Sequence, residues 1–225
     1  MAVVLVLALG VGGVVWYQSQ NKSRDSVMVP YTMLLPQKII DGTYYKKGDD
    51  NTVCSDCLTS TEEIKKLGIK SGFPWAAHYV QNPAESAAGD PKHGPTVSVI
   101  GIQGQVTQPV AAVDGVLARM HEDETKKAKA LGVTIQGIEP VKVAEYKGDT
   151  FDGTVMKCES LMLKPKAGLD NDVVVARCVW GDASAVGIVQ QQVVGVESSL
   201  PNTNDLAHAT LKVRNEARQP HPRNA

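Results

Sequence analysis

Residues 153–189 read GTVMKCESLMLKPKAGLDNDVVVARCVWGDASAVGIV, and the predicted fold is built around them. Its first part, 153–163, alternates with a period of two. Cys158 therefore falls on one face, while Lys157 and Glu159 fall on the other. This alternation is typical of a half-buried β-strand.

The second part of the stretch turns back on the first. Turn-forming residues surround Gly168, and 173–180 is then a β-branched run whose lone charge is Arg177. Residues 181–184 have the composition of a tight turn, and 185–189 is again apolar. We predict a hairpin that continues into a third antiparallel strand, and that these three strands form the centre of a sheet.

A hairpin that is symmetric about Gly168 has one register. In that register Cys158 lies opposite Cys178 and Met156 lies opposite Trp180, so both cysteines occupy the same inward face. A directly opposed antiparallel pair places the two Cβ atoms within bridging range. We therefore predict a disulfide between Cys158 and Cys178.

The remaining cysteines, Cys54 and Cys57, are separated by two residues in the sequence Cys-Ser-Asp-Cys. Of the three connectivities that four cysteines permit, we expect these two to pair locally. Two thiols at this spacing can also form a redox couple or half of a zinc site. A thioredoxin-like motif would open a helix after a strand, whereas these cysteines precede a separate helix expected at Thr61–Leu67, which begins after Ser60.

The turn at 181–184 contains the best candidate for a surface site, the pair Asp182 and Ser184. The spacing of Ser184 between Gly181 and Gly187 is wrong for a nucleophile elbow. Asp182 is expected to cap the turn through an Asx hydrogen bond. No catalytic residue is predicted.

Three segments of the chain resemble a family of uncharacterised actinobacterial membrane-anchored proteins. The segments that carry the resemblance are Met156–Cys158, Cys178–Gly187 and Lys212–Arg218. Family members have a Pro/Gly/Gln-rich cytoplasmic tail, one membrane span and an extracytoplasmic domain without an assigned activity. The resemblance therefore implies a topology and no chemistry. The sequence differs in lacking the tail, in having Gly181 where a small Ala-like residue is expected, and in having Cys54 and Cys57.

The N-terminal segment is expected to be a membrane anchor. Residues 2–17 are apolar throughout and would span about 24 Å as a helix, somewhat less than the roughly 30 Å of a hydrocarbon core. No basic n-region or small-x-small cleavage site is present, so an uncleaved, N-terminally truncated anchor at 1–17 is favoured over a cleaved signal peptide. Residues 18–29 have the composition of a juxtamembrane linker.

The sequence contains opposing indications of the orientation of the anchor in the membrane. Lys22 and Arg24 follow the span, and the positive-inside rule alone would place the domain in the cytoplasm. The cysteines indicate an oxidising compartment, and the resemblance implies the same side. We expect a single-pass protein of the cell membrane with its C-terminal domain outside.

Residues 30–217 are expected to form one α+β domain, an antiparallel sheet of five to seven strands packed on two longer helices. The helices are predicted at 109–124 and 205–217, where apolar residues recur at helical spacing. A PsbP-like sandwich is an analogue of this arrangement. Residues 121–124, His-Glu-Asp-Glu, are interpreted as a solvated helix face and not as metal ligands. Residues 218–225 are expected to be a disordered tail.

The amino-acid composition and the absence of known motifs disfavour several classes of function. The net charge is −1, with 23 basic and 24 acidic residues, so no basic stripe for nucleic acid is present. Only 5% of residues are aromatic, which disfavours a carbohydrate-stacking platform. No hydrolase, phosphate-loop or dinucleotide motif occurs, and no metal or cofactor is expected. We predict a non-enzymatic module that binds an envelope protein or ligand; the alternative is a thiol–disulfide protein that uses Cys54 and Cys57.

Overall fold

A computed structural model describes residues 31–48, 61–81, 96–132, 134–137, 144–145, 154–164, 173–194 and 203–220. The expected anchor and linker, together with Cys54 and Cys57, lie outside the described residues. Among the helices that are described, none is both long enough and apolar enough to span a bilayer.

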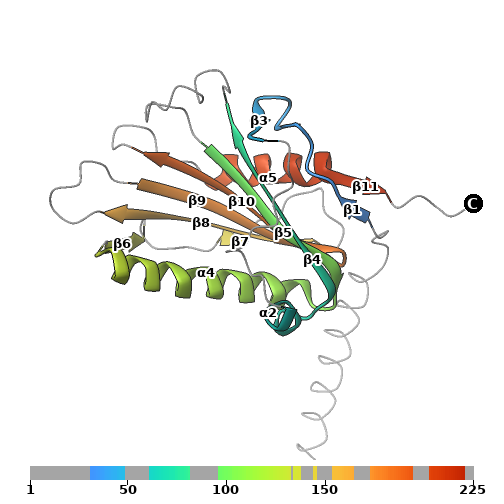
Figure 1. The fold of residues 1–225 in the computed structure, drawn as a ribbon, viewed down its shortest axis with the longest axis horizontal. Helices are drawn as coiled ribbons and strands as arrows, with labels where there is room; N and C mark the ends of the chain where they lie inside the picture. Colours follow the sequence, from blue (N-terminus) through green and yellow to red (C-terminus); the bar gives the residue numbers. More distant parts are fainter. Residues whose placement is uncertain are drawn as a thin grey trace, which may run out of the picture.

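An antiparallel sheet forms the centre of the molecule (Figure 1). In the described part of the chain it has nine strands, in the order β2-β3-β4-β5-β10-β9-β8-β6 with β7 also paired to β8. The strands are β2 (Lys38–Ile39), β3 (Tyr44–Lys46), β4 (Ile69–Val80), β5 (Thr96–Val106), β6 (Thr134–Gly137), β7 (Ala144–Glu145), β8 (Val155–Lys164), β9 (Val173–Gly181) and β10 (Ala185–Val194). The sheet is larger than predicted because two-residue strands such as β2 and β7 are too short to show a period of two in the sequence.

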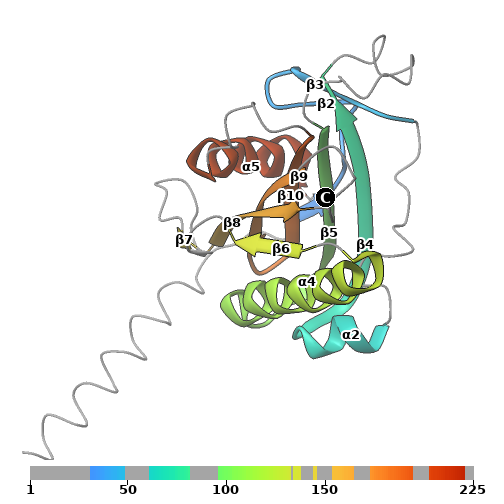
Figure 2. The same ribbon diagram turned by 90° about the vertical axis from the view of Figure 1, so that its left-hand side faces the viewer.

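Helices cover the sheet on both sides (Figure 2). One face packs against α5 (Thr203–Ala217), and the other packs against α4 (Pro109–Leu131) and the short α2 (Thr61–Lys66). The predicted α+β class and the two longer helices are confirmed. Helix α4 is longer than predicted because 126–131 consists of good helix formers, and it ends at Gly132, whose φ of 67° is left-handed.

The predicted hairpin is confirmed in its register. Cys158 lies opposite Cys178 and Met156 opposite Trp180 in the β8–β9 pair. Strand β10 follows as the third antiparallel strand and pairs with β9 and β5. Both faces of β9 are buried, as its β-branched run indicates, whereas the face of β8 that was expected to be solvated is covered by α4.

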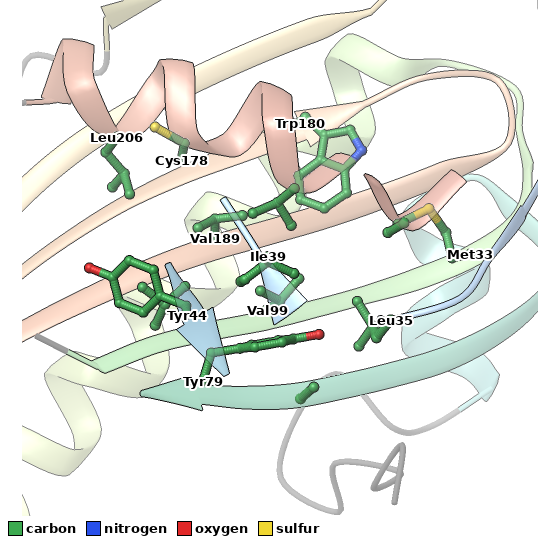
Figure 3. Close-up of a cluster of buried hydrophobic side chains, with 14 of the residues drawn as sticks. Met33, Leu35, Ile39, Tyr44, Tyr79, Val99, Cys178, Trp180, Val189 and Leu206 are labelled. Carbon is green, nitrogen blue, oxygen red and sulfur yellow. The ribbon is translucent and has the colours of Figure 1, made fainter. Parts of the chain in front are cut away.

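Trp180 lies among the buried side chains of the core that faces α5 (Figure 3). Trp75 belongs to the same core, and each of the two indoles lies over a glycine. One cross-strand row runs Trp75–Gly101–Gly187–Trp180, and the two indole rings are 6.0 Å apart at their centroids. A Cβ atom on Gly101 would lie 2.2 Å from the Trp75 ring, and one on Gly187 would lie 2.0 Å from the Trp180 ring. Glycine at both positions therefore lets the indoles lie flat on the sheet.

The two ends of the described chain pair with each other. Residues Arg218–Pro220, expected to belong to a disordered tail, form β11, and β11 pairs with β1 (Tyr31–Met33) in a separate two-stranded sheet. A side-chain hydrogen bond also joins β1 to the main sheet, because Oε1 of Gln103 in β5 accepts the Met33 N–H at 3.0 Å. The tail prediction is wrong for 218–220 because their partner strand lies at the opposite end of the sequence.

Candidate functional site

Asp182 and Ser184 are buried, so they do not form the surface site that the sequence suggested. The exposed fraction is 0% for Asp182 and 9% for Ser184. Oδ1 of Asp182 accepts the backbone N–H groups of Ser184 at 2.8 Å and Ala185 at 3.1 Å. These bonds confirm the predicted Asx turn, which joins β9 to β10.

The other carboxylate oxygen of Asp182 connects the turn to both ends of the domain. It accepts Nε and Nη2 of Arg214 in α5 at 3.0 and 2.6 Å, and the Tyr31 hydroxyl of β1 at 2.5 Å. Burial, together with the negative charge of Asp182, raises the pKa of Tyr31 well above its usual range. The hydroxyl therefore stays protonated and donates. Asp182 acts as a structural joint between the turn, α5 and β1.

A second buried charge cluster lies between the sheet and α4. Arg177 of β9 and Glu159 of β8 are directly opposite each other, and Nε of Arg177 donates to Glu159 at 2.5 Å. Nη1 and Nη2 of Arg177 contact the carboxylate of Glu124. Nε2 of His121 lies 2.9 Å from both oxygens of Glu159. Both Arg177 and Glu159 are almost fully buried.

This cluster corrects the interpretation of 121–124 as a solvated helix face. His121 and Glu124 are three residues apart and face the sheet, while Glu122, between them, pairs with Lys126 on the exposed side. Among the described residues, no group of three or more His, Cys, Asp or Glu side chains is arranged to hold a metal ion. Four charged or ionisable groups that contact one another in this way satisfy each other's hydrogen bonds, and the arrangement stabilises the packing of α4 on the sheet.

The predicted disulfide between Cys158 and Cys178 is present. Its Cα atoms are 4.0 Å apart and it closes a segment with a sequence separation of 20. Both cysteines are buried beneath α5. Since Cys54 and Cys57 lie outside the described residues, their predicted pairing remains a prediction.

Removing this disulfide with the pair of substitutions Cys158→Ala and Cys178→Ala is expected to lower the free energy of unfolding by about 3 kcal/mol, because the unfolded chain gains the freedom of an open loop. For a domain of this size that corresponds to a fall of about 6–12 °C in melting temperature. Thermal unfolding monitored by circular dichroism measures it. Substitution is preferable to a reducing agent, which would also act on Cys54 and Cys57. An unchanged melting temperature would contradict the prediction.

A polar region on the α4 side of the sheet is the best candidate for a binding site. Two neighbouring cross-strand rows form it: Lys38–Tyr45–Val80–Thr96–Gln192 and His78–Ser98–Gln190. We call the region made by Lys38, Tyr45, His78, Thr96, Ser98, Gln190 and Gln192 the open polar face. Four of its side chains are exposed and three are half-buried. No helix of the described chain packs over it, since α4 lies along β8 and β9 and α2 contacts the opposite end of β4.

The open polar face contains a contact that the sequence did not reveal. Nδ1 of His78 lies 2.9 Å from the Ser98 hydroxyl, and the two residues are directly opposite in β4 and β5. The second row continues through Gln190 to the Arg177–Glu159 pair, so it crosses five strands. A signal was present in the sequence, because His78 and Ser98 alternate with the apolar residues of their own strands. Pairing them required the β4–β5 register.

In hydrolytic triads, a histidine lies within hydrogen-bond distance of a nucleophilic serine, so we compared the His78–Ser98 contact with that arrangement. In the described part of the chain, no carboxylate is hydrogen-bonded to His78 to orient its ring. Ser98 lies in the middle of a strand that is paired on both sides, so the backbone N–H groups around it already bond within the sheet. An oxyanion hole requires such groups to be free. The contact therefore has the geometry of a surface hydrogen bond between strands.

A scan against protein-family models finds no match to the chain, and a search of curated proteins finds none that is similar. The interpretation of the open polar face consequently depends on its geometry.

Proposed function

We propose that the chain is a membrane-anchored, extracytoplasmic, non-enzymatic binding module, and that its open polar face binds an envelope protein. The proposal depends on a set of polar side chains from β2, β3, β4, β5 and β10, four exposed and three half-buried, that no helix of the described chain covers. Antiparallel sheets often leave a polar face in water, but here helices pack on both faces of the rest of the sheet, so the open polar face is the part of the sheet that a partner can reach.

The chemistry of the open polar face favours a neutral, hydrogen-bonding partner surface. Serine, threonine and glutamine side chains each donate and accept, and Tyr45 adds an aromatic ring with Lys38 stacked 4.9 Å from its centroid. Small ligands are usually held in concave sites that bury most of their surface. Side chains that stand exposed on a sheet offer contact area without such enclosure, which suits a protein partner.

The proposed location is supported by two observations. Residues 2–17 are continuously apolar, as a membrane anchor requires. The disulfide between Cys158 and Cys178 is of a kind that persists in oxidising compartments, which favours the extracytoplasmic side.

The arrangement of helices on both faces of an antiparallel sheet supports the analogy with a PsbP-like sandwich.

Site-specific photo-crosslinking in native membranes tests this function. A photoreactive amino acid at Gln192, on the open polar face, should capture a partner protein, whereas the same amino acid at Ala118, exposed on α4, should not. The additional substitution Ser98→Arg places charge and bulk in the centre of the face and should lower the yield at Gln192 by about tenfold, equivalent to 1.4 kcal/mol of binding free energy. Equal capture at both positions, or a yield that Ser98→Arg leaves unchanged, would contradict the proposal.

A further inference from the structure

The large apolar side chains that are exposed among the described residues lie at one end of the sheet. Leu34, Phe73 and Val110 are the exposed large hydrophobic residues there, with exposed fractions of 51%, 64% and 52%. Phe73 pairs with Gln103 near the end of β5, and Leu34 follows Met33, which is bonded to the same Gln103. We call this end, which also includes the Asp182 turn, the turn end of the sheet.

Val110 belongs to the turn end because α4 begins there. The carbonyl oxygen of Pro109, the residue before it, lies 3.1 Å from the position that a Cβ atom on Gly181 would take. Gly181 is the last residue of β9 before the Asp182 turn. The three apolar side chains thus come from different elements that lie at the same end of the sheet.

Both ends of the described chain also leave from the turn end. Tyr31 pairs with Pro220, and the Tyr31 hydroxyl bonds to Asp182 in the turn. Thirteen residues, 18–30, separate Tyr31 from the apolar segment 2–17. Fully extended, they span at most about 45 Å, and a flexible chain of that length has a mean end-to-end distance of roughly 20 Å. An anchor at 2–17 would therefore keep the turn end within about 45 Å of the bilayer.

We infer that the turn end of the sheet rests on the surface of the membrane that holds the chain's own anchor, with Phe73 and Leu34 inserted among the lipid headgroups. The inference rests on the proposed function, which supplies the anchor. Three exposed lysines shortly precede Phe73 in the sequence, Lys65 and Lys66 in α2 and Lys70 at the start of β4. Apolar side chains flanked by lysine are what a peripheral contact with anionic lipid uses.

This placement has a consequence for the binding site. The open polar face lies towards the opposite ends of β4 and β5, because Thr96 and Val80 are seven residues from Gln103 and Phe73 along their strands. At about 3.4 Å per residue, Thr96 is roughly 24 Å from the turn end, and Ser98, five residues from Gln103, is roughly 17 Å from it. A domain that rests on its turn end holds the open polar face away from the lipid, where an envelope protein can reach it.

Quenching of tryptophan fluorescence by brominated lipid tests the inference on the full chain in phosphatidylglycerol-containing vesicles. Separate variants carry Phe73→Trp, Leu34→Trp or, as the matched control at the far end of β5, Thr96→Trp. The emission that each new tryptophan adds to the parent spectrum is compared in brominated and ordinary vesicles. We expect roughly twofold quenching for Phe73→Trp and Leu34→Trp and little for Thr96→Trp, since interfacial side chains reach only the headgroup and upper acyl region.

The outcomes separate the inference from the proposed function. A chain that alkaline carbonate strips from the vesicles has no anchor, which would overturn the proposed location and the inference together. A chain that stays integrated but shows equal quenching at residues 73 and 96, or none at either, keeps its anchor and overturns the inference alone. Melting temperatures equal to that of the parent establish that each variant is folded, and the two reporters at 34 and 73 come from different segments, so one of them suffices if the other disturbs the fold.

Discussion

Replacing Asp182 with alanine is expected to lower the free energy of unfolding by about 3–5 kcal/mol, the range found when one partner of a buried ion pair is removed. The buried guanidinium of Arg214 loses two of its hydrogen bonds, and the Tyr31 hydroxyl loses its acceptor. The Asx turn loses both backbone contacts as well. Urea unfolding followed by circular dichroism measures the change.

Two further variants identify which part of the joint matters. Asp182→Asn keeps an acceptor for the turn but removes the charge, so it should lie between the parent and Asp182→Ala. Ser184→Ala removes only a hydroxyl, because Asp182 is bonded to the backbone N–H of Ser184 and not to its side chain. Since Ser184 is buried, the variant should lose about 1 kcal/mol or less, the net value of one hydrogen bond and well below the loss for Asp182→Ala. An Asp182→Ala variant as stable as the parent would contradict the structural role of the joint.

Replacing Arg177 with methionine is expected to be similarly severe, a loss of about 3–5 kcal/mol, because the carboxylate of Glu159 would remain buried without its counter-charge. The double substitution Arg177→Met and Glu159→Met removes both charges and leaves apolar side chains of similar length. It should recover most of the loss, since well-packed apolar residues often replace a buried ion pair without cost.

His121 and Glu124 provide the controls for this second cluster. Both are partly exposed, with side-chain exposures of 43% and 24%, so water can solvate them when the sheet residues change. Glu124→Gln should therefore cost about 1 kcal/mol or less, by comparison with partly exposed ion pairs. A double variant as unstable as Arg177→Met alone would contradict this prediction. It would show that the cluster stabilises the fold by more than neutralising its own buried charges.

The sequence predicted the centre of the fold because the signals there are local. A period of two, a turn around Gly168 and two cysteines at symmetric positions together determine the register of β8 and β9. The same register places Glu159 opposite Arg177, so the buried ion pair could have been inferred from the lone charge in β9. It was missed because Lys157 and Glu159 indicate a solvated face until α4 is known to cover it.

Contacts between distant segments could not be predicted in the same way. Tyr31 and Asp182 are 151 residues apart, and Arg214 is 32 residues beyond Asp182. A polar pair in a turn, Asp182 and Ser184, has the appearance of a surface site when its partners are unknown. Likewise His78 and Ser98 lie in separate strands, and only their pairing in the sheet reveals the open polar face.

The pairing of β1 with β11 also constrains when the domain can be completed. A ribosome adds roughly 5–20 residues per second, so the 189 residues that follow Tyr31 up to Pro220 take about 10–40 s to make. During that interval the hairpins β8–β9 and β9–β10 can close, because their contacts are local, whereas β1 has neither its strand partner nor Arg214 beside it. Tyr31 and Met33, buried in the finished domain, must wait in an unfinished chain. A chain that ends before α5 would keep this first strand permanently unpaired, and so present an apolar segment of the kind that chaperones and proteases recognise.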